Sequence, residues 1–207
     1  IYKELRMSIL TDKEIKDYAK RGMISPFIDA KIVISEQGIS CPSYGLSHCG
    51  YDVVLQPKFS IGKKTDRVLS ILENNTKDWF DEVEANSIIV PPKGLVLSVT
   101  KEHFRLPTNI VGSLFCKSTL ARMGIWFPPT IAEPGWEGEL VVEILNGNDF
   151  PVEIHAGVGI GQMIFFRLDS GVDVPYNGKY QFQTGIAYGT NNTDRLAEID
   201  TPLERGM

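Results

Sequence analysis

Short apolar runs separated by turn-forming residues dominate this 207-residue chain and limit what it can fold into. Each run is shorter than a typical helix, and Gly, Pro, Asn or Asp separates most of them. No long helical pattern lies between the runs, which argues against a parallel βαβ arrangement. The spacing therefore predicts an all-β sandwich or barrel. The runs lie at residues 32–34, 51–55, 87–90, 95–99, 110–115, 140–145 and 160–166.

One short helix is expected near the start, at about residues 12–21. Thr11 and Glu14 have the spacing of a capping box, and Gly22 suits the C-terminal cap. Residues 66–79 are expected to hold either one helical turn or a polar loop. The apolar stripe of the helix consists of Ile15, Tyr18 and Ala19.

The length and the 43% hydrophobic content fit one domain with a sizeable core. Met7 suits a natural start, so residues 1–6 are interpreted as an extension outside the fold. The domain is then expected to cover residues 7–185. Residues 186–207 form a polar C-terminal tail, and we expect this tail to be mobile, which matters if it covers a site.

The net charge of -5 argues against a general nucleic-acid surface, because such surfaces are usually basic. The three cysteines, Cys41, Cys49 and Cys116, form no CxxC pair and suggest neither a disulfide framework nor a zinc site. The start lacks a long apolar region, and no run of about 18 apolar residues occurs. We therefore expect a cytoplasmic protein with no nucleic-acid or membrane partner.

Glu143 is an acid inside an apolar run, between Val142 and Ile144. Strand alternation would place Glu143 on one face with Val141 and Leu145, so the pattern does not make it an obvious surface residue. Burial raises the pKa of a carboxyl group, and a Glu can then exchange protons near neutral pH. Two interpretations stay open, a catalytic acid and an ordinary residue that points to solvent.

Lys117, Ser118, Thr119 and Arg122 fall close together directly after the apolar run at 110–115. Hydroxyls, backbone N–H groups, a guanidinium and an ammonium are all donors to phosphate oxygens. The alternative is a solvated turn. The segment is not a P-loop, because the GxxxxGK[ST] spacing is absent.

A second polar set, Tyr176, Lys179, Tyr180 and Gln183, lies close to the tail. An aromatic, a cation and an amide beside a mobile segment would suit a lid over a charged ligand, and the alternative is an edge strand with ordinary surface residues. Gln162 is either a surface residue at a strand end or an amide in a pocket.

Histidine-based chemistry has little support in the sequence. His48, His103 and His155 are scattered, and the His-x-Glu and Pro-Cys-x-x-Cys signature of zinc deaminases is missing. A Ser-His-Asp hydrolase has no more support, because no GxSxG elbow occurs.

Taken together and in this order, these segments resemble the dCTP deaminases of the dUTPase-like superfamily. The resemblance includes the opening at residues 7–27 and spans Met7 to about Gly185. The residues that carry it are SYGLSHCGYD at 43–52, CKSTLARMG at 116–124, EPGWEGELVVEILN at 133–146, the Gly-Gln-apolar strand at 161–166 and KYQFQTG at 179–185.

The resemblance implies a mainly β fold of the dUTPase-like type, a β-barrel or β-clip that forms a distorted jelly roll with a short N-terminal helix. It implies a homotrimer with active sites between subunits. The implied reaction is the zinc-independent hydrolytic deamination of dCTP to dUTP and ammonia, which supplies dUTP for thymidine nucleotide synthesis. Mg²⁺ is implied as a companion of the triphosphate, held by phosphates and waters and not by protein ligands.

The resemblance also assigns residues to roles. Glu143 matches the proton-shuttling glutamate, which would act first as a base and then as an acid. Ser118 would hold or polarise the attacking water, and Arg122 would orient Glu143 or stabilise developing charge. The implied nucleotide-binding residues are Lys117, Ser118, Thr119, Leu120, Ala121, Arg122, Glu133, Val141, Val142, Glu143, Gln162, Tyr176, Lys179 and Gln183.

This chain departs from its relatives at two places. Trp126, Phe127, Pro128 and Pro129 replace a modest apolar pair, so the wall of the base pocket is expected to differ. The stretch between Tyr176 and Lys179 is shorter than usual and lacks a basic residue. Base selectivity and lid closure are the inferences that these differences affect, and a modified cytosine substrate stays open.

Rival functions remain. A dUTPase, or a bifunctional enzyme that makes dUMP from dCTP, is one alternative, because Glu133 could activate water toward phosphorus. The presence of Glu143 favours deamination, since uracil needs no proton relay. A catalytically silent nucleotide sensor on the same fold is the other alternative. The product dUTP and the nucleotide dTTP are further candidate ligands. The sequence leaves open whether dTTP inhibits the protein.

Overall fold

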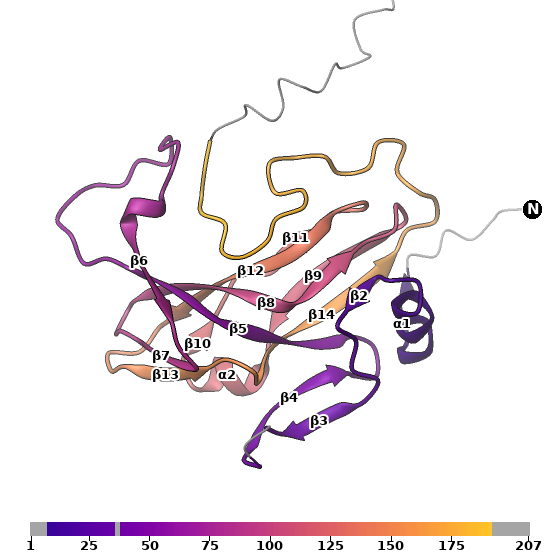
Figure 1. The fold of residues 1–207 in the computed structure, drawn as a ribbon, viewed down its shortest axis with the longest axis horizontal. Helices are drawn as coiled ribbons and strands as arrows, with labels where there is room; N and C mark the ends of the chain where they lie inside the picture. The colour runs from indigo at the N-terminus through magenta and orange to yellow at the C-terminus, as the bar shows by residue number, and fades with distance from the viewer. Residues whose placement is uncertain (1–7, 36–37, 192–207) are drawn as a thin grey trace, which may run out of the picture.

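The computed structural model describes residues 8–35 and 38–191 and has a mainly β architecture, as the sequence predicts (Figure 1). The helices are α1 (Asp12–Ala19), α2 (Ser118–Arg122) and the 3-10 helix η1 (Lys77–Trp79). The strands are β1 (Ser8–Ile9), β2 (Ile24–Ser25), β3 (Lys31–Ile34), β4 (Ser40–Leu46), β5 (Tyr51–Gly62), β6 (Phe80–Glu84), β7 (Ser87–Val90), β8 (Leu95–Arg105), β9 (Ile110–Cys116), β10 (Ile125–Trp126), β11 (Thr130–Ala132), β12 (Glu137–Asn146), β13 (Val152–His155) and β14 (Gly159–Arg167).

The expected N-terminal helix is present and has a complete capping box. The backbone N–H of Thr11 donates to Glu14 Oε2 at 2.9 Å, and the N–H of Glu14 donates to Thr11 Oγ1 at 3.4 Å. Ile15 is fully buried and anchors the apolar stripe. The helix ends at Ala19, earlier than expected, and Gly22 takes a φ of +89° in the turn that follows. Among the described residues, no helix is long and apolar enough to cross a membrane.

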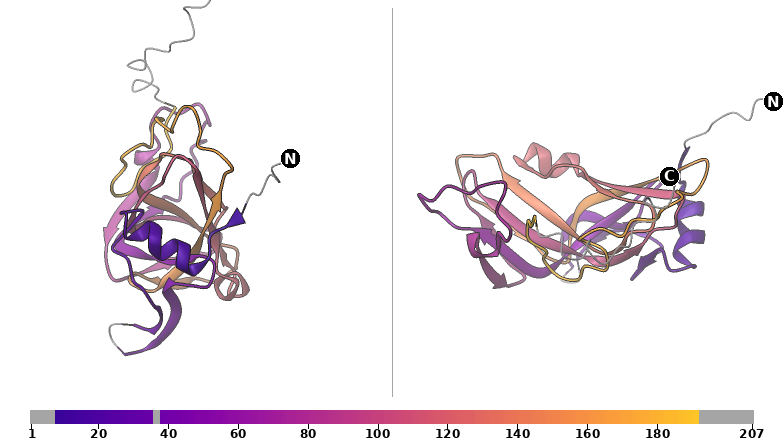
Figure 2. Two further views of the ribbon diagram at one scale, coloured as in Figure 1. Left: turned by 90° about the vertical axis from the view of Figure 1, so that its right-hand side faces the viewer. Right: turned by 90° about the horizontal axis from the view of Figure 1, so that it is seen from above.

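A single curled antiparallel sheet contains the longest strands, in the order β10-β12-β8-β5-β14-β9-β11. The sheet wraps around a common interior, which is visible in the end-on view (Figure 2). The strands β7 and β13 form a separate two-stranded sheet, and the hairpin β3–β4 projects from one end (Figure 1). This curled sheet agrees with the expected barrel-like fold.

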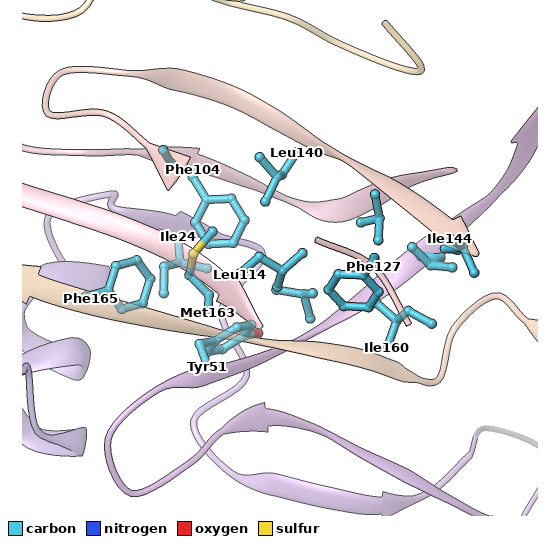
Figure 3. Packing of buried hydrophobic residues seen from close by; sticks show 14 of the residues in the cluster. Ile24, Tyr51, Phe104, Leu114, Phe127, Leu140, Ile144, Ile160, Met163 and Phe165 are labelled. Atoms are coloured by element: carbon cyan, nitrogen blue, oxygen red, sulfur yellow. The ribbon is translucent and has the colours of Figure 1, made fainter. Parts of the chain in front are cut away.

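The core lies inside the curl and is built from alternate residues of facing strands. Tyr51, Leu114, Met163 and Phe165 are each 0% exposed and belong to one cluster with Phe104 (Figure 3). Each large apolar side chain buried in this way contributes about 1.5–3 kcal/mol.

The inserted loop between β5 and β6 contains the single turn η1, and the rest of it is irregular. Residues 1–6, expected to be an extension, and the tail beyond residue 191 lie outside the described residues. Residues 186–191 of the expected tail are described, and they pack against this loop. The side chain of Asn191 donates to the carbonyls of Ile71 and Glu73, at 2.6 and 3.2 Å.

Candidate active site

A cavity of about 360 Å³ lies against β12 and is lined mostly by apolar and aromatic side chains. Its acids are Glu133 and Glu143. Of the other expected site residues, Val141, Tyr176 and Gln183 also line it. The structure therefore brings together five of the predicted site residues from two distant parts of the chain.

Glu143 lies on β12 opposite Leu97 of β8, and its side chain is half-buried in this cavity. Desolvation raises the pKa of its carboxyl, and the hydrogen bonds from its own backbone and from Thr130 act in the opposite direction. Thr130 Oγ1 donates to Glu143 Oε2 at 3.4 Å. The side chain of Glu143 therefore faces a partly desolvated cavity and does not simply point to open solvent, and its catalytic role stays a prediction.

A tight turn at residues 133–136 places Glu133 at the cavity. The N–H of Trp136 donates to the carbonyl of Glu133 at 3.0 Å, with Pro134 and Gly135 in the two central positions. Gly135 has a φ of +85°, as the second central position of a type II turn requires. A Cβ on Gly135 would lie 2.6 Å from Pro175 Cβ, so the C-terminal segment packs directly on this glycine.

The C-terminal segment lies beside β11 and β12 in the ribbon (Figure 1). Tyr176, Tyr180 and Gln183 of this segment line the same cavity of their own chain. Gln183 forms an isolated parallel bridge with Gly138, and its Nε2 donates to the carbonyl of Glu139 at 2.6 Å. Trp136 Nε1 donates to the carbonyl of Tyr180 at 2.9 Å. Residues 176–191 therefore form an irregular cover over the cavity, with a single isolated bridge. They do not form the edge strand that was the alternative interpretation of this segment.

Tyr188 anchors this cover and was not among the predicted site residues. Its hydroxyl lies 2.7 Å from Ser60 Oγ and donates to Glu82 Oε1 at 2.8 Å, and its ring lies 5.5 Å from the ring of Phe80. Strand register places Glu82 opposite Ser60 and Ser60 opposite Leu97. Since Leu97 in turn is opposite Glu143, Tyr188 closes the cavity two strands away from Glu143. A lone tyrosine in a polar tail gives no sequence signal for this role.

Lys179, predicted as a nucleotide contact, does not line the cavity in this chain. Its Nζ donates to the carbonyl of Thr190 and lies 5.0 Å from the ring centroid of Tyr180. The Lys179 ammonium therefore makes its contacts within the C-terminal segment itself.

The predicted phosphate-binding segment forms the short helix α2 and not a solvated turn. Ser118, Thr119, Ala121 and Arg122 are exposed, and Arg122 Nη1 donates to Ser118 Oγ at 3.3 Å. The side chain of Leu120 packs into the core, so only its backbone can face a ligand.

Lys117, directly before α2, is held in a buried ion pair that the sequence did not predict. Its Nζ lies 2.6 Å from Asp52 Oδ2 and donates to Ser43 Oγ at 3.1 Å, and Ser43 Oγ donates to Asp52 at 2.8 Å. Asp52 is 1% exposed, and its Oδ1 has no hydrogen-bond partner within the described chain. The signal was present, because Asp52 is an acid inside the apolar run 51–55, as Glu143 is in its own run.

Gln162 lies next to the group formed by Lys117, Asp52 and Ser43. It is opposite Asp52 of β5 and Phe115 of β9, so these three share one face of the sheet. Their neighbours Met163 and Leu114 face the core instead. No residue from 115 to 124, nor Asp52 or Gln162, lines the Glu143 cavity. One chain therefore does not bring the basic segment and Glu143 into one site.

Two further predicted parts of the site place no side chain, or little of one, in this cavity within one chain. The segment 126–129 was expected to form a wall of the base pocket, but none of its residues lines this cavity. Phe127 is 3% exposed and belongs to the core, and Trp126 pairs with Leu145 at the far end of β12. Val142 is fully buried opposite Ser98, so it can contact a ligand only through its backbone.

A family profile described as dCTP deaminase-like matches residues 9–168. The chain belongs to the dCTP deaminase-like family. The predicted resemblance is therefore confirmed. The matched span includes Glu143, Glu133 and all of α2, whereas the cover at residues 176–191 lies beyond it.

Individual members of the dCTP deaminase-like family match over most of the chain. A dCTP deaminase of Acinetobacter baylyi is 36% identical over 184 residues, which are 87% of this chain and 97% of the relative. A dCTP deaminase of Herpetosiphon aurantiacus is 40% identical with the same coverage. Both matches therefore extend over nearly the whole length of the relative.

A solved structure confirms the fold. The 2'-deoxycytidine 5'-triphosphate deaminase from Agrobacterium tumefaciens superposes with a TM-score of 0.57 at 17% identity, and the match covers 78% of this chain and 48% of that chain. At this identity the likeness concerns the fold alone. The mainly β fold of the family is thereby shown.

Proposed function

We propose that this protein hydrolyses the exocyclic amino group of dCTP and releases dUTP and ammonia. The observation that carries the proposal is the half-buried carboxyl of Glu143 in a mostly apolar cavity, with a pKa raised by desolvation. A carboxyl in this environment can take and return a proton near neutral pH. The dUTP formed would serve thymidine nucleotide synthesis.

The reaction needs two proton transfers that one carboxyl can perform in turn. Glu143 takes a proton from water, the hydroxide forms a bond to C4 of cytosine, and Glu143 passes the proton to N3 of the ring. Glu143 then takes the proton of the new C4 hydroxyl and gives it to the amino group, the C4–N4 bond breaks, and ammonia leaves as the C4 carbonyl forms. Water supplies the oxygen, and the proton transfers require no zinc at the base.

The base would lie along β12, where its edge meets the backbone of Val141 and Val142. Val142 can take part only through its peptide groups, because its side chain faces the core. Tyr176 and Gln183 from the cover would close the opposite side. Sites of this kind combine apolar walls with a few polar groups that fix the orientation.

The triphosphate would require α2 from a neighbouring copy. Ser118 and Arg122 are exposed and lie outside the Glu143 cavity of their own chain, whereas the proposed chemistry needs all three together. Ser118 would then hold the attacking water, and Arg122 would orient Glu143 or meet phosphate. A closed homotrimer places the same two patches in contact at each of its interfaces.

Mg²⁺ would accompany the triphosphate, where it neutralises phosphate charge when bound. Among the described residues, the carboxylate of Asp52 contacts Lys117 of the predicted phosphate-binding segment, and its Oδ1 is buried without a partner. Mg²⁺ prefers oxygen donors and keeps several of its waters, so phosphates and waters would supply most of its ligands. Lys117, which contacts the same carboxylate, would meet the phosphates, and Gln162 shares this face.

A bifunctional deaminase and diphosphatase is the second candidate, because Glu133 lines the same cavity and its side chain is exposed. A carboxylate there could activate a second water toward the α-phosphorus of dUTP. The product would then be dUMP with pyrophosphate.

Incubation with dCTP and Mg²⁺, followed by separation of the products, tests the proposal. Formation of dUTP and ammonia without pyrophosphate supports it. Formation of dUMP and pyrophosphate would replace it with the bifunctional enzyme. Binding of dCTP without turnover would leave a silent nucleotide sensor on the family fold. Addition of dTTP to the same assay measures whether that nucleotide inhibits.

A further inference from the structure

The strand that carries Glu143 is interrupted beside the cavity by an irregular pairing with β8. Glu139 is opposite His103 and Val141 is opposite Val99, so Leu140 alone faces the three residues from Thr100 to Glu102. Extra residues of this kind leave backbone groups without their ladder partners. The free groups lie in the interior, where an unpaired N–H is costly.

Two buried side chains replace the missing ladder bonds. The N–H of Leu140 donates to Thr100 Oγ1 at 2.9 Å, and the Thr100 hydroxyl donates to the carbonyl of Glu102 at 2.8 Å. The N–H of Val54 donates to Glu102 Oε2 at 3.2 Å. Thr100 is 0% exposed and Glu102 is 1% exposed, so no solvent molecule at the surface can substitute for these partners.

The hydroxyl of Thr100 acts on the strand at a point that matters for the proposed chemistry. Leu140, which it holds, lines the Glu143 cavity and directly precedes Val141 on β12. Thr100 itself does not line the cavity and is not placed to touch a substrate. Any influence of Thr100 on the reaction therefore passes through the position of β12.

We infer that Thr100 is a positioning residue for Glu143, because its hydroxyl fixes the backbone of β12 at Leu140. The inference rests on the proposed deamination at Glu143. Removal of the oxygen leaves the Leu140 N–H buried without an acceptor, and the strand must shift or admit water to satisfy it. A shift of about 1 Å in a catalytic group can cost about 10²-fold in rate.

Ser98 provides a matched control on the same strand. It is also 0% exposed, and its hydroxyl donates to the carbonyl of Lys58 at 2.8 Å. That bond joins β8 to β5, on the side away from β12. Loss of the Ser98 hydroxyl therefore removes one buried hydrogen bond without freeing a backbone group of the Glu143 strand.

The test compares Thr100→Val, Thr100→Ser and Ser98→Ala in steady-state deamination of dCTP. We expect Thr100→Val to lower kcat by about 10- to 100-fold with KM within about 3-fold, since chemistry and not binding depends on the position of Glu143. Thr100→Ser, which keeps the oxygen, should restore kcat to within about 3-fold of the parent. Equal kcat in Thr100→Val and the parent protein, or an equal loss in Ser98→Ala, would overturn the inference.

A pair of milder substitutions covers the case in which Thr100→Val does not fold. Thr100→Cys and Thr100→Ser have almost the same size, but the thiol is a much weaker acceptor than the hydroxyl. A lower kcat for Thr100→Cys is expected, and equal kcat values would contradict the role.

A readout without substrate separates this inference from the proposed function. The ionisation of Glu143 can be followed by the carboxyl ¹³C shift in the parent protein and in Thr100→Val. We expect its pKa to fall toward the ordinary range when the strand loosens and water enters. An unchanged titration would reject the positioning role even if the parent protein did not deaminate dCTP, whereas absent turnover alone would reject only the proposed function.

Discussion

Glu143 on β12 and Glu102 on β8 are acids on neighbouring strands, but a raised pKa has a different effect at each of them. Glu143 is half-buried and opens on the cavity, so its proton can reach a bound molecule. Glu102 is 1% exposed, lines no described cavity, and has a pKa raised to about 7, mainly by burial. A raised pKa at Glu143 affects the reaction, whereas at Glu102 it affects the dependence of stability on pH.

Replacement of Glu102 by Gln should remove part of that dependence. The folded-state pKa of about 7 lies above the ordinary value, so the folded protein retains a proton that the unfolded chain loses as pH rises. Stability therefore falls between about pH 4.5 and pH 7 and stays low above it, by up to about 3 kcal/mol for this group. Gln keeps the shape and the oxygen that accepts from Val54.

Urea unfolding at pH 5 and pH 8 measures this effect. The parent protein should lose more stability between the two pH values than Glu102→Gln, and the difference between the two losses isolates Glu102 from other groups such as Glu143. The same loss in both proteins would show that Glu102 is not protonated in the folded state at pH 5.

The sequence could indicate buried acids but not their partners. An acid within an apolar run identified Glu143, and the same pattern at Asp52 in the run 51–55 marks a second buried carboxylate. The pattern could not show that Lys117 would pair with Asp52, because that contact depends on how β5 and the end of β9 meet in space. Local periodicity carries no information about such distant pairs.

At the scale of elements, features fixed by local chemistry were predictable. The capping box of α1 and the strand at 137–146 follow from short-range patterns, and both are present. The extra residues of β8 at Thr100–Glu102 were not predicted, because the alternation there continues without a Gly or Pro to mark the irregularity. The packing of residues 186–191 was also missed, since polar composition alone suggested a free tail.

The cover over the cavity should depend on the hydroxyl of Tyr188. Tyr188→Phe removes the contacts to Ser60 and Glu82 while the ring can still pack on Phe80. We expect a global stability loss of about 1 kcal/mol or less, together with faster amide hydrogen exchange in residues 183–191. Hydrogen exchange measured by mass spectrometry reports the exchange rate of residues 183–191 separately from that of the other segments.

Tyr180→Phe is the matched control for the cover. Tyr180 also lines the cavity, and among the described residues its hydroxyl has no hydrogen-bond partner. Exchange in 183–191 should stay at the parent rate in this variant. Faster exchange in Tyr180→Phe than in Tyr188→Phe would mean that the Tyr188 hydroxyl does not hold the cover.

At the scale of the whole molecule, the separation of two groups of residues is the dominant feature. Glu143, Glu133, Tyr176 and Gln183 line one cavity, whereas α2 and Asp52 lie elsewhere on the same chain. The curl of the sheet places them apart, and short-range sequence patterns cannot reveal that separation. The all-β class was predictable from the spacing of the strands, but the strand order was not.

Subunit complementation tests whether neighbouring copies complete the site. Glu143→Gln and Arg122→Ala should each abolish most activity, and sedimentation should give about three times the chain mass of 23.1 kDa. If each site takes Glu143 from one copy and Arg122 from another, mixed trimers of the two variants contain about one intact site in four. Activity should therefore return to about a quarter of the parent level after co-refolding.

No recovery in the mixture, with confirmed exchange of subunits, would place both residues in one chain's site. A monomer in sedimentation with full activity would exclude a shared site altogether. The control is Glu143→Gln refolded alone under the same conditions, and it should stay inactive.

The most direct measurement of the central claim is turnover of dCTP by Glu143→Gln beside the parent protein, with nucleotide affinity measured on both. The substitution keeps the size of the side chain and removes its ability to exchange a proton. We predict that dUTP formation falls by about 10²- to 10⁴-fold while the affinity for dCTP stays within about 3-fold. Undiminished dUTP formation by the variant would contradict the account, because Glu143 would then have no part in the chemistry.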